Sequence, residues 1–261
     1  MGEVHPTARG FEQAARDYER GRPGYPPAAI EALAAALSVG PGRRIADVGA
    51  GTGKLTRELV GRGAEVVAVE PAAAMRAELE RSLPGVEVLA GTAEALPLRD
   101  AVVDACVAAQ AFHWFDAPRA LPELHRVTRP GGGLGIVFNR RDLTTPEQAA
   151  VDELLAGDRG DTPTWANDDW LETLAGSPWF APAELHRVPW VQHLDADGLR
   201  SRVRSVSFVA TLTGAARQRV LDGVDAIFAM HARAGVVSLH YLAEVRVASR
   251  LDATVTPPVE P

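Results

Sequence analysis

The chain has 261 residues with 46% apolar side chains, enough to bury a full core, and its 34 acidic residues outnumber its 27 basic ones. No long block of like charge is present, so the basic stripe typical of nucleic-acid-binding proteins is missing, and we expect no nucleic-acid partner. The single cysteine, Cys106, excludes a disulfide framework and favours a reducing compartment, while the longest apolar stretch, residues 28–39, is too short to span a bilayer. We therefore expect a soluble, cytoplasmic protein without a membrane partner.

The N-terminal segment predicts a leader followed by one helix. Residues 1–10 are expected to be disordered, and a polar segment with aromatic residues then runs into a Gly- and Pro-rich turn. Tyr18 and Arg22 stand four positions apart here, on one face if the segment is helical. Residues 27–37 are rich in alanine and predict a helix that a Gly-Pro-Gly turn ends.

A glycine cluster follows the first predicted strand. An apolar run that begins at Arg44 passes into Asp47-Val48-Gly49-Ala50-Gly51-Thr52-Gly53, and a helical pattern then continues to Val60. This order predicts a strand, a tight loop and a helix. The glycines permit positive φ and let backbone N–H groups approach a ligand closely, and the start of the helix adds a positive dipole end. The cluster therefore predicts a nucleotide-binding loop.

Three types of nucleotide-binding loop differ in the spacing of their glycines and neighbouring residues. A phosphate-binding P-loop requires a hydroxyl residue where Leu55 stands, and a dinucleotide-binding fingerprint requires a glycine where Lys54 stands. The spacing Asp47-x-Gly49-x-Gly51-x-Gly53 is instead the pattern of the class I S-adenosylmethionine (SAM) methyltransferases, and the chain resembles that family. A glycine turn that only lets a helix pack on a strand is the structural alternative.

The second predicted strand ends in an acid. Residues 65–70 predict a buried parallel strand, and residues 71–83 predict a helix. Glu70 lies 21 residues after Gly49, where a carboxylate can accept hydrogen bonds from both hydroxyls of a ribose, as it also does in dinucleotide folds. In the resembled family, the side chain at the position of Met75 covers one face of the adenine, a contact that suits a thioether.

A third predicted strand, residues 86–89, leads into the loop of residues 91–98. This loop resembles the family's Gly-Asp-Ala-Glu-x-Leu-Pro-Phe loop, in which the acid binds the adenine amino group and the next backbone N–H binds the ring. Thr92 stands where that acid is usual, and its hydroxyl can accept one hydrogen bond. Glu94 has either an adenine-side role or a structural one.

A fourth predicted strand, residues 102–109, feeds the run Gln110-Ala111-Phe112-His113-Trp114-Phe115-Asp116 at the ligand-binding edge of the sheet. His113 has two interpretations. As a general base for a hydroxyl acceptor it would make the rate rise with pH near 6.5. As a packed residue it would only shape the acceptor pocket, which we favour because methyl transfer can proceed by proximity alone. Asp104 and Cys106 are expected to be structural.

The next elements complete the core. A helix capped by Asp116 is expected to run to residue 129, with its regular turns beginning only near Leu121 because Pro122 disfavours an earlier start. His125 on this helix is interpreted as structural. Residues 134–138 then predict a fifth strand.

The C-terminal part begins with an insertion. Short helices over residues 146–156 and 168–175 carry or flank three tryptophans, which fit either a substrate lid or packing between helices. The remaining pattern predicts a strand over residues 184–193, helices over 197–206 and 214–232, and a strand over 236–247. The basic cluster Arg200, Arg202 and Arg204 is interpreted as a solvated face, and no spacing typical of a metal site is present.

Two further motifs narrow the resemblance. Tyr-x-x-x-Arg-Pro-x-Tyr-Pro in the leader and Ala-x-His-Trp-Phe after the fourth strand resemble small-molecule methyltransferases of the trans-aconitate type, in the type 11 family. The likeness is close over residues 11–139 and loose over 184–250. It implies an α/β fold with a doubly wound, mostly parallel, seven-stranded Rossmann-like sheet. It also implies one domain over residues 1–261: a SAM-binding core (11–139), a helical lid insertion (140–183), sheet completion (184–250) and a loose tail (252–261).

The resemblance also implies site residues. It places Arg22 opposite the methionine carboxylate of SAM, His113 as the candidate catalytic residue, and no metal. The implied cofactor-binding residues are Tyr18, Arg22, Asp47, Gly49, Ala50, Gly51, Thr52, Gly53, Glu70, Pro71, Met75, Thr92, Ala93, Glu94 and Gln110. The implied acceptor-binding residues are Phe112, His113 and Trp114.

The implied function is transfer of the SAM methyl group to a small molecule, with S-adenosylhomocysteine as the second product. O-methylation of a carboxylate or hydroxyl is favoured. Two alternatives remain: the same fold used for non-methyl chemistry, or a SAM-binding subunit without turnover. A nicotinamide oxidoreductase is opposed by the glycine spacing and by the Leu-Pro loop.

Overall fold

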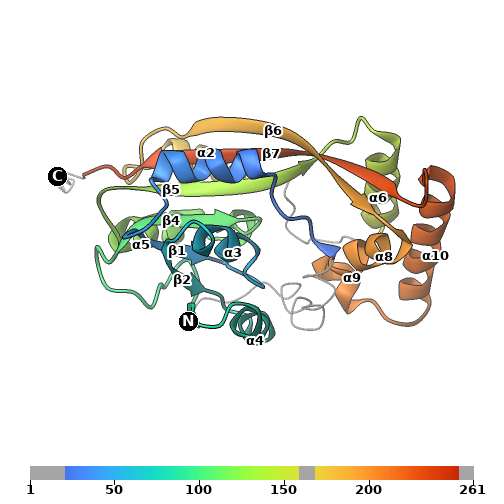
Figure 1. Cartoon of the computed structure of the whole chain (residues 1–261), viewed down its shortest axis with the longest axis horizontal. Coiled ribbons are helices and arrows are strands. Elements are labelled where there is room, and N and C mark those ends of the chain that lie inside the picture. Colours follow the sequence, from blue (N-terminus) through green and yellow to red (C-terminus); the bar gives the residue numbers. More distant parts are fainter. Residues whose placement is uncertain (1–20, 159–167, 253–261) are drawn as a thin grey trace, which may run out of the picture.

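The computed structural model describes residues 21–158 and 168–252, which form a sheet flanked by helices and a helical lobe at one end (Figure 1). The strands are β1 (Arg44–Val48), β2 (Glu65–Val69), β3 (Glu87–Leu89), β4 (Val103–Ala109), β5 (Thr128–Arg141), β6 (Glu184–Leu194) and β7 (Val237–Ser249). The helices are α2 (Pro27–Leu37), α3 (Lys54–Val60), α4 (Ala73–Ser82), η2 (Phe112–Trp114), α5 (Ala117–Val127), α6 (Pro146–Ala156), α7 (Asp169–Ala175), α8 (Ala196–Arg204), α9 (Ser207–Thr211) and α10 (Gly214–His231). The predictions for the leader, Tyr18, Trp165 and most of the tail lie outside the described residues.

The strands form one seven-stranded sheet in the order β3-β2-β1-β4-β5-β7-β6. Neighbouring strands from β3 to β5 are parallel, and β7 runs antiparallel to both β5 and β6. The predicted doubly wound, mostly parallel, seven-stranded fold is confirmed. The carboxyl ends of β1, β2 and β4 therefore lie at one edge, where ligands bind in such sheets.

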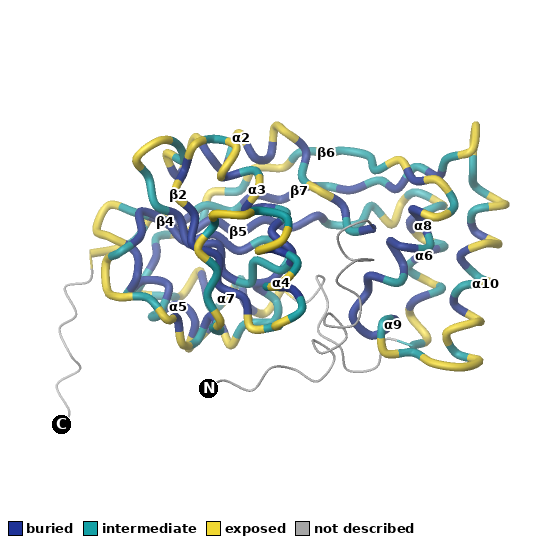
Figure 2. The backbone as a smooth tube through the Cα atoms, turned by 60° about the horizontal axis from the view of Figure 1, so that its bottom comes forward, coloured by how far each residue is buried: buried dark blue, intermediate teal, exposed yellow. Residues whose placement is uncertain are grey.

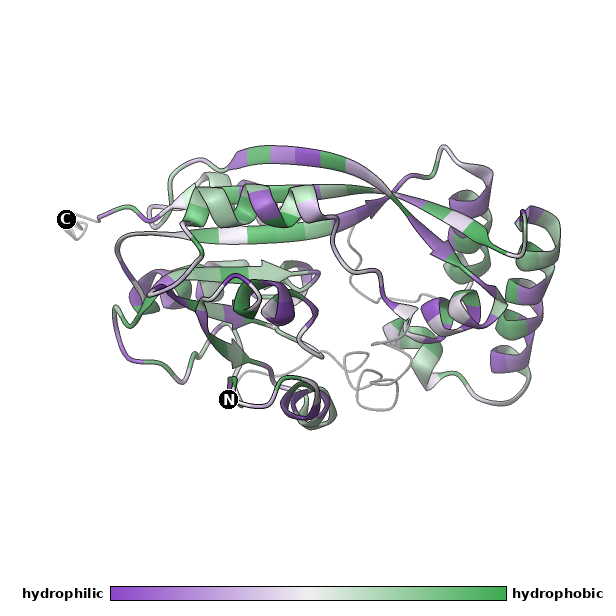
Figure 3. Cartoon of the chain, in the orientation of Figure 1, coloured by the Kyte–Doolittle hydropathy of each residue, from purple (hydrophilic) through white to green (hydrophobic). Residues whose placement is uncertain are grey.

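Each face of the sheet has its own core, because successive side chains of a strand point to opposite faces. Ile45 on β1 joins a cluster under α2 and α3, whereas its neighbour Ala46 joins the cluster under α5 and α7. On β4, Val107 joins the cluster under α2 and α3 and Cys106 joins the cluster under α5 and α7, and both are fully buried. Apolar residues concentrate on these strands in Figure 3, and the same strands form the buried centre of Figure 2.

The helical lobe is built on the far ends of β6 and β7, which extend beyond the rest of the sheet (Figure 1). Helices α6, α8, α9 and α10 pack there around a third apolar cluster that includes Leu199, Val224 and Leu239. The two helices of the predicted lid insertion take different positions: α6 packs against α10, and α7 packs against α5. Trp170 on α7 is buried in the core under α5, and Trp179 contacts the His125 ring.

Three expectations about α5 and β5 are wrong in detail. Helix α5 begins at Ala117 despite Pro122. The proline removes only one backbone hydrogen bond, to a carbonyl in the first turn of the helix, and the helix buries Leu121 and Leu124. Asp116 occupies the N-cap position, but its side chain makes no capping hydrogen bond. The chain turns directly into β5 at Thr128, which pairs with Val103 of β4, so the helix ends before residue 129.

Candidate functional site

A cavity lies where the carboxyl ends of the central strands face the helical lobe. Its lining residues come from segments far apart in the sequence. The sheet side contributes Asp47, Gly49, Ala50, Lys54, Leu55, Ala109 and Gln110. The rest of the lining, called the far wall below, comes from the segment before α2, from β5, from α8 and from β7: Arg22, Pro23, Tyr25, Asn139, Arg141, Arg202 and Tyr241.

The glycine loop between β1 and α3 has the conformation that its spacing predicts. Gly49, Gly51 and Gly53 have φ values of +70°, +57° and +86°, in the region that favours glycine. A Cβ atom at Gly49 would lie 2.7 Å from the Cβ atom of Ala111. The loop therefore stays close to the segment after β4, with Ala50 at its surface and Thr52 fully buried beneath it.

Glu70 follows β2 and ties this loop in place. Its Oε2 atom accepts a hydrogen bond from the Gly51 N–H and its Oε1 atom accepts one from the Ala72 N–H, both at 2.9 Å. Burial raises the pKa of Glu70 above its ordinary value, and the two backbone N–H groups offset part of that rise. Each carboxylate oxygen accepts more than one hydrogen bond, so both still have capacity for a ribose hydroxyl.

Asp47 is the buried acid at the end of β1. Its Oδ2 atom accepts a hydrogen bond of 2.6 Å from the Thr56 hydroxyl, while its Oδ1 atom is buried with no hydrogen-bond partner among the described residues. The pKa of Asp47 is raised to about 7. Burial is the largest cause, the nearby charge of Glu70 acts in the same direction, and the hydrogen bonds with Thr56 oppose both. A carboxylate with an unused oxygen therefore borders the cavity next to the glycine loop.

The predicted adenine-side residues lie beyond the cavity, on the side of β2 and β3. Met75 and Ala93 are buried, and the Thr92 hydroxyl is buried without a hydrogen-bond partner in the described part of the chain. Glu94 accepts a hydrogen bond of 2.9 Å from the Asp116 N–H, which supports its structural interpretation. Pro71 is exposed on the surface after β2.

Gln110 stands directly after β4 in a left-handed conformation, with φ of +56°. Its backbone N–H donates a hydrogen bond of 2.8 Å to the Val137 carbonyl of β5, which fixes the turn. A non-glycine residue with this conformation is uncommon and points to a constrained site. The predicted cofactor-binding residues Arg22, Asp47, Gly49, Ala50 and Gln110 thus converge on one cavity.

His113 does not line that cavity but a second pocket, between η2 and α7. Phe112 and His113 line this pocket, and the His113 ring contacts Trp114 and Phe138 at centroid distances of 5.3 and 5.5 Å. Its Nδ1 atom is buried with no hydrogen-bond partner among the described residues. The pKa of His113 is lowered to about 3, mainly by burial and also by the charges of Arg22 and Arg140.

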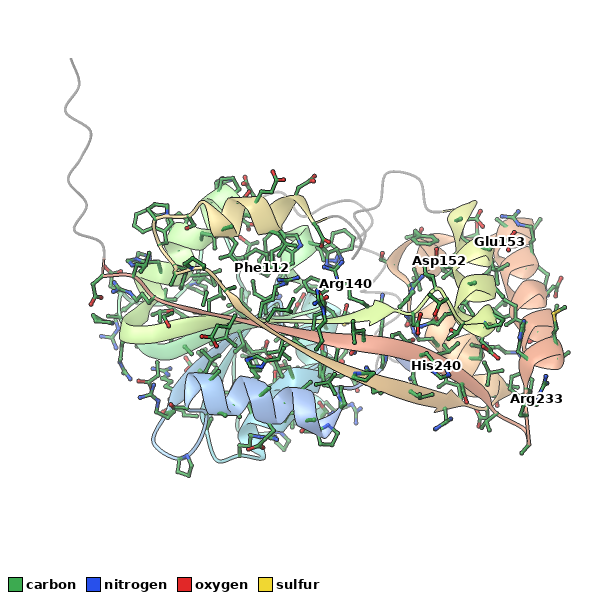
Figure 4. All side chains as sticks on the ribbon, turned by 90° about the horizontal axis from the view of Figure 1, so that it is seen from above. Phe112, Arg140, Asp152, Glu153, Arg233 and His240 are labelled. Carbon is green, nitrogen blue, oxygen red and sulfur yellow. The ribbon has the colours of Figure 1, made fainter. Side chains whose placement is uncertain are left out.

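Arg140 lies near this aromatic cluster (Figure 4). Its guanidinium carbon is 5.6 Å from the Phe138 ring centroid, and the side chain also pairs with Glu244 and Asp168. A pKa of about 3 means that His113 is neutral at every physiological pH and is a weak proton acceptor. The lowered pKa favours the pocket-shaping interpretation of His113 over the general-base interpretation, and both stay predictions.

The far wall of the cavity contains residues that the sequence motifs do not indicate. Arg141 on β5 pairs with Asp152 on α6, which is labelled in Figure 4. Arg202 on α8 donates a hydrogen bond of 3.2 Å from its Nε atom to the Tyr241 hydroxyl of β7. The interpretation of Arg202 as part of a solvated face is wrong, because only 4% of the residue is exposed.

The comparisons with known proteins agree with this geometry. The model of a methyltransferase domain family matches residues 46–136. An uncharacterized methyltransferase of Mycobacterium tuberculosis is 41% identical over 221 residues, which cover 85% of this chain and 86% of that protein. The chain belongs to the SAM-dependent methyltransferases.

Two more proteins illustrate the range of the family. A malonyl-[acyl-carrier protein] O-methyltransferase of Pectobacterium atrosepticum is 40% identical over 103 residues, 39% of this chain and 41% of that one. The structure of a putative type II methyltransferase from Anaeromyxobacter dehalogenans superposes with a TM-score of 0.60 at 29% identity, over 88% of this chain and 96% of that chain. As a member of this family, the protein is an enzyme whose cofactor is SAM.

One observation bears on the fit of SAM to this edge of the sheet: the buried Oδ1 atom of Asp47 has no hydrogen-bond partner among the described residues. A carboxylate oxygen in this state suits a nucleoside that carries a positive charge. No helix in the described part of the chain is long and apolar enough to cross a membrane.

Proposed function

We propose that this methyltransferase transfers the SAM methyl group to an oxygen atom of a small molecule, either a carboxylate or a hydroxyl oxygen. The observation that carries this proposal is the single cavity that the glycine loop shares with a polar far wall. Its lining combines charged, polar and apolar side chains, as small-molecule pockets do, and the net charge of −7 is unsuited to a nucleic-acid acceptor.

SAM supplies an activated methyl group on a sulfonium sulfur. The chain's own contribution is to hold the acceptor in line with that methyl group and to exclude water, since the leaving thioether needs little assistance. Gly49, Asp47 and Gln110 would hold the cofactor side, and the far wall would hold the acceptor. With a neutral His113 outside this cavity, its role is to shape the aromatic neighbourhood of the site.

The partial similarity to a malonyl-[acyl-carrier protein] O-methyltransferase supports oxygen as the acceptor atom. The lone, fully buried thiol of Cys106 supports a reducing compartment, and we propose the cytoplasm. The division of the chain into a SAM-binding core, a lid insertion, a sheet completion and a tail remains a proposal.

Labelled SAM tests the proposal. The purified protein is incubated with methyl-labelled SAM and low-molecular-weight fractions of a cell lysate, and labelled products are separated and treated with mild base. Methyl esters release their label as methanol, whereas methyl ethers keep it. Binding of S-adenosylhomocysteine without label transfer to any fraction would contradict the proposal and favour non-methyl chemistry or a binding subunit.

A further inference from the structure

We propose that the acceptor is a carboxylic acid and that Arg202 binds its carboxylate at the far wall of the cavity. This inference rests on the proposed function, because it names the chemical class of the acceptor for the same site. The buried guanidinium group of Arg202 has no acidic partner in the described part of the chain.

Arg202 is held in the interior of the protein. It lies on α8 with 4% of its surface exposed, and it lines the cavity. Its side-chain hydrogen bond among the described residues joins Nε to the Tyr241 hydroxyl at 3.2 Å, and no carboxylate of those residues lies within 4.0 Å of it. Burying a guanidinium without a counter-charge is costly, so a fold that keeps one there favours an anion beside it.

Two other arginines show that this arrangement is specific to Arg202. Arg141, also on the cavity wall, pairs with Asp152. Arg200, two positions before Arg202 on the same helix, pairs with both Asp197 and Asp225 at the surface. On this helix, the partly exposed Arg200 thus has acidic partners, whereas the buried Arg202 has none among the described residues.

The charge around Arg202 strengthens the case. Arg22, Lys54, Arg141 and Arg202 line the cavity with four positive charges, and Asp47 on the cofactor side is the acid in that lining. The pKa of Arg141 is lowered to about 10, first by burial and then by the charge of Arg202, while Tyr241 and Asp152 oppose this shift and Arg22 adds a smaller lowering. These like charges repel one another, so a bound anion would stabilise all of them.

The position of the guanidinium is fixed by hydrogen bonds. Tyr241 accepts the Nε bond and donates its own hydrogen bond of 3.4 Å to the Gln192 side chain, which in turn donates one of 3.3 Å to the Gly21 carbonyl. A Cβ atom at Gly21 would lie 2.2 Å from the Ser201 carbonyl carbon, so this segment lies directly on α8. With Nε engaged, the two terminal nitrogens of Arg202 remain as a fork that matches the two oxygens of a carboxylate.

The neutral polar groups on the same wall do not compete for this role. The Asn139 amide donates a hydrogen bond of 2.8 Å to the Gly24 carbonyl and accepts one of 2.9 Å from the Trp190 indole. Asn139 therefore fixes the leader segment against the sheet. The positive fork of Arg202 is the better recognition element for a small ligand.

Arg202→Gln and the matched control Arg200→Gln test this inference. The probe is the acidic fraction of a protein-free lysate, retained on an anion exchanger, together with the same fraction after amidation of its carboxylates by carbodiimide and methylamine. Label transfer from SAM is expected with the acidic fraction and not with the amidated one. Arg202→Gln is expected to lower the rate at limiting acceptor at least about 30-fold, and to leave the affinity for S-adenosylhomocysteine within about twofold. Arg200→Gln is expected to match the wild type.

Other outcomes separate this inference from the proposed function. Label transfer to neutral compounds, or an unchanged rate in Arg202→Gln, would overturn the carboxylate assignment while the methyltransferase proposal stands. Failure of every fraction to accept label would overturn both. If Arg202→Gln does not fold, Arg202→Lys replaces it: the charge is kept and the fork is lost, so the KM of the acidic fraction should rise at least about fivefold with kcat retained. An unchanged KM in that variant would also overturn the assignment.

Discussion

At the scale of single residues, two buried acids divide the work at the end of the first two strands. Glu70 uses both oxygens to accept hydrogen bonds from the backbone N–H groups of Gly51 and Ala72, so it shapes the glycine loop, and we propose that it also binds a ribose. Asp47 keeps one oxygen without a hydrogen-bond partner among the described residues, beside the cavity. Their substitutions should therefore affect cofactor binding in different ways.

Replacing Glu70 by alanine should weaken SAM binding by about 1.5–3 kcal/mol, because charge-assisted hydrogen bonds to the loop and the ligand are lost together. Calorimetric titration of the folded variant measures this loss. Glu70→Gln is the matched control, since it keeps the shape and one acceptor and should lose less. Unchanged affinity in Glu70→Ala would place the ribose elsewhere.

Asp47 should make SAM binding depend on pH. Its pKa is raised to about 7, so the carboxyl group is neutral below that value and ionised above it, and only the ionised form attracts the sulfonium cation. Affinity should therefore increase with pH, by roughly tenfold or about 1.4 kcal/mol between pH 6 and 8. Glu70 also has a raised pKa, so the comparison with Asp47→Asn isolates the share due to Asp47.

S-adenosylhomocysteine provides a second control for Asp47, because its sulfur is uncharged. Its affinity should change less with pH than that of SAM in the wild-type protein. Equal pH dependence for the two ligands, or an unchanged dependence in Asp47→Asn, would show that the carboxylate does not interact with the sulfonium charge.

His113 should not give a pH step. Its pKa is lowered to about 3, so the neutral ring persists from pH 5 to 9 and cannot cause a rise in rate near 6.5. His113→Gln should raise the acceptor's KM and leave both the pH profile and SAM affinity nearly unchanged. A fall in kcat of about 100-fold or more with loss of a pH step would restore the general-base hypothesis.

At the scale of elements, the segment before α2 joins the sheet to the helical lobe. Gly21 contacts α8, the Arg22 guanidinium donates a hydrogen bond of 3.2 Å to the Ser205 carbonyl, and Gly24 is held by Asn139. This short segment contributes Arg22, Pro23 and Tyr25 to the cavity. Residues 23–26 form neither helix nor strand, so we expect lower local stability here than in the strands beneath.

Amide hydrogen exchange over residues 21–25 should therefore slow when S-adenosylhomocysteine binds, because a ligand in the cavity adds contacts to this segment. Mass spectrometry of overlapping peptides measures the change. Peptides from α10, which lies on the far side of the helical lobe, provide the internal reference and should exchange equally in both states. Equal exchange over residues 21–25 with and without ligand would leave this segment as a fixed wall.

At the scale of the whole molecule, the site lies between two bodies that share β6 and β7. The sheet presents the glycine loop, and the helical lobe presents Arg202 across the cavity from it. The lobe has its own apolar cluster around Leu199, Val203 and Val224, so it holds α8 independently of the sheet core.

The sequence by itself determined the features that depend on local spacing. The acid and three glycines from Asp47 to Gly53 identified the loop, because positive φ and close backbone approach restrict the residue type at each position. Periodic apolar runs placed the strands and the long helices within a few residues, since one buried face imposes its period on the chain. The family and its cofactor followed from these local patterns.

Only the tertiary structure decided which charged residues line the cavity. Arg200, Arg202 and Arg204 look alike in the sequence, but a helix turns successive alternate residues to nearly opposite sides, and the packing of α8 against β6 and β7 selects Arg202 for burial. His113 lines a separate aromatic pocket, whereas its place in the sequence predicted the reactive edge of the sheet. Whether a charge is solvated, paired or held for a ligand depends on segments distant in the chain, and residues 22, 141, 202 and 241 meet only when the fold is complete.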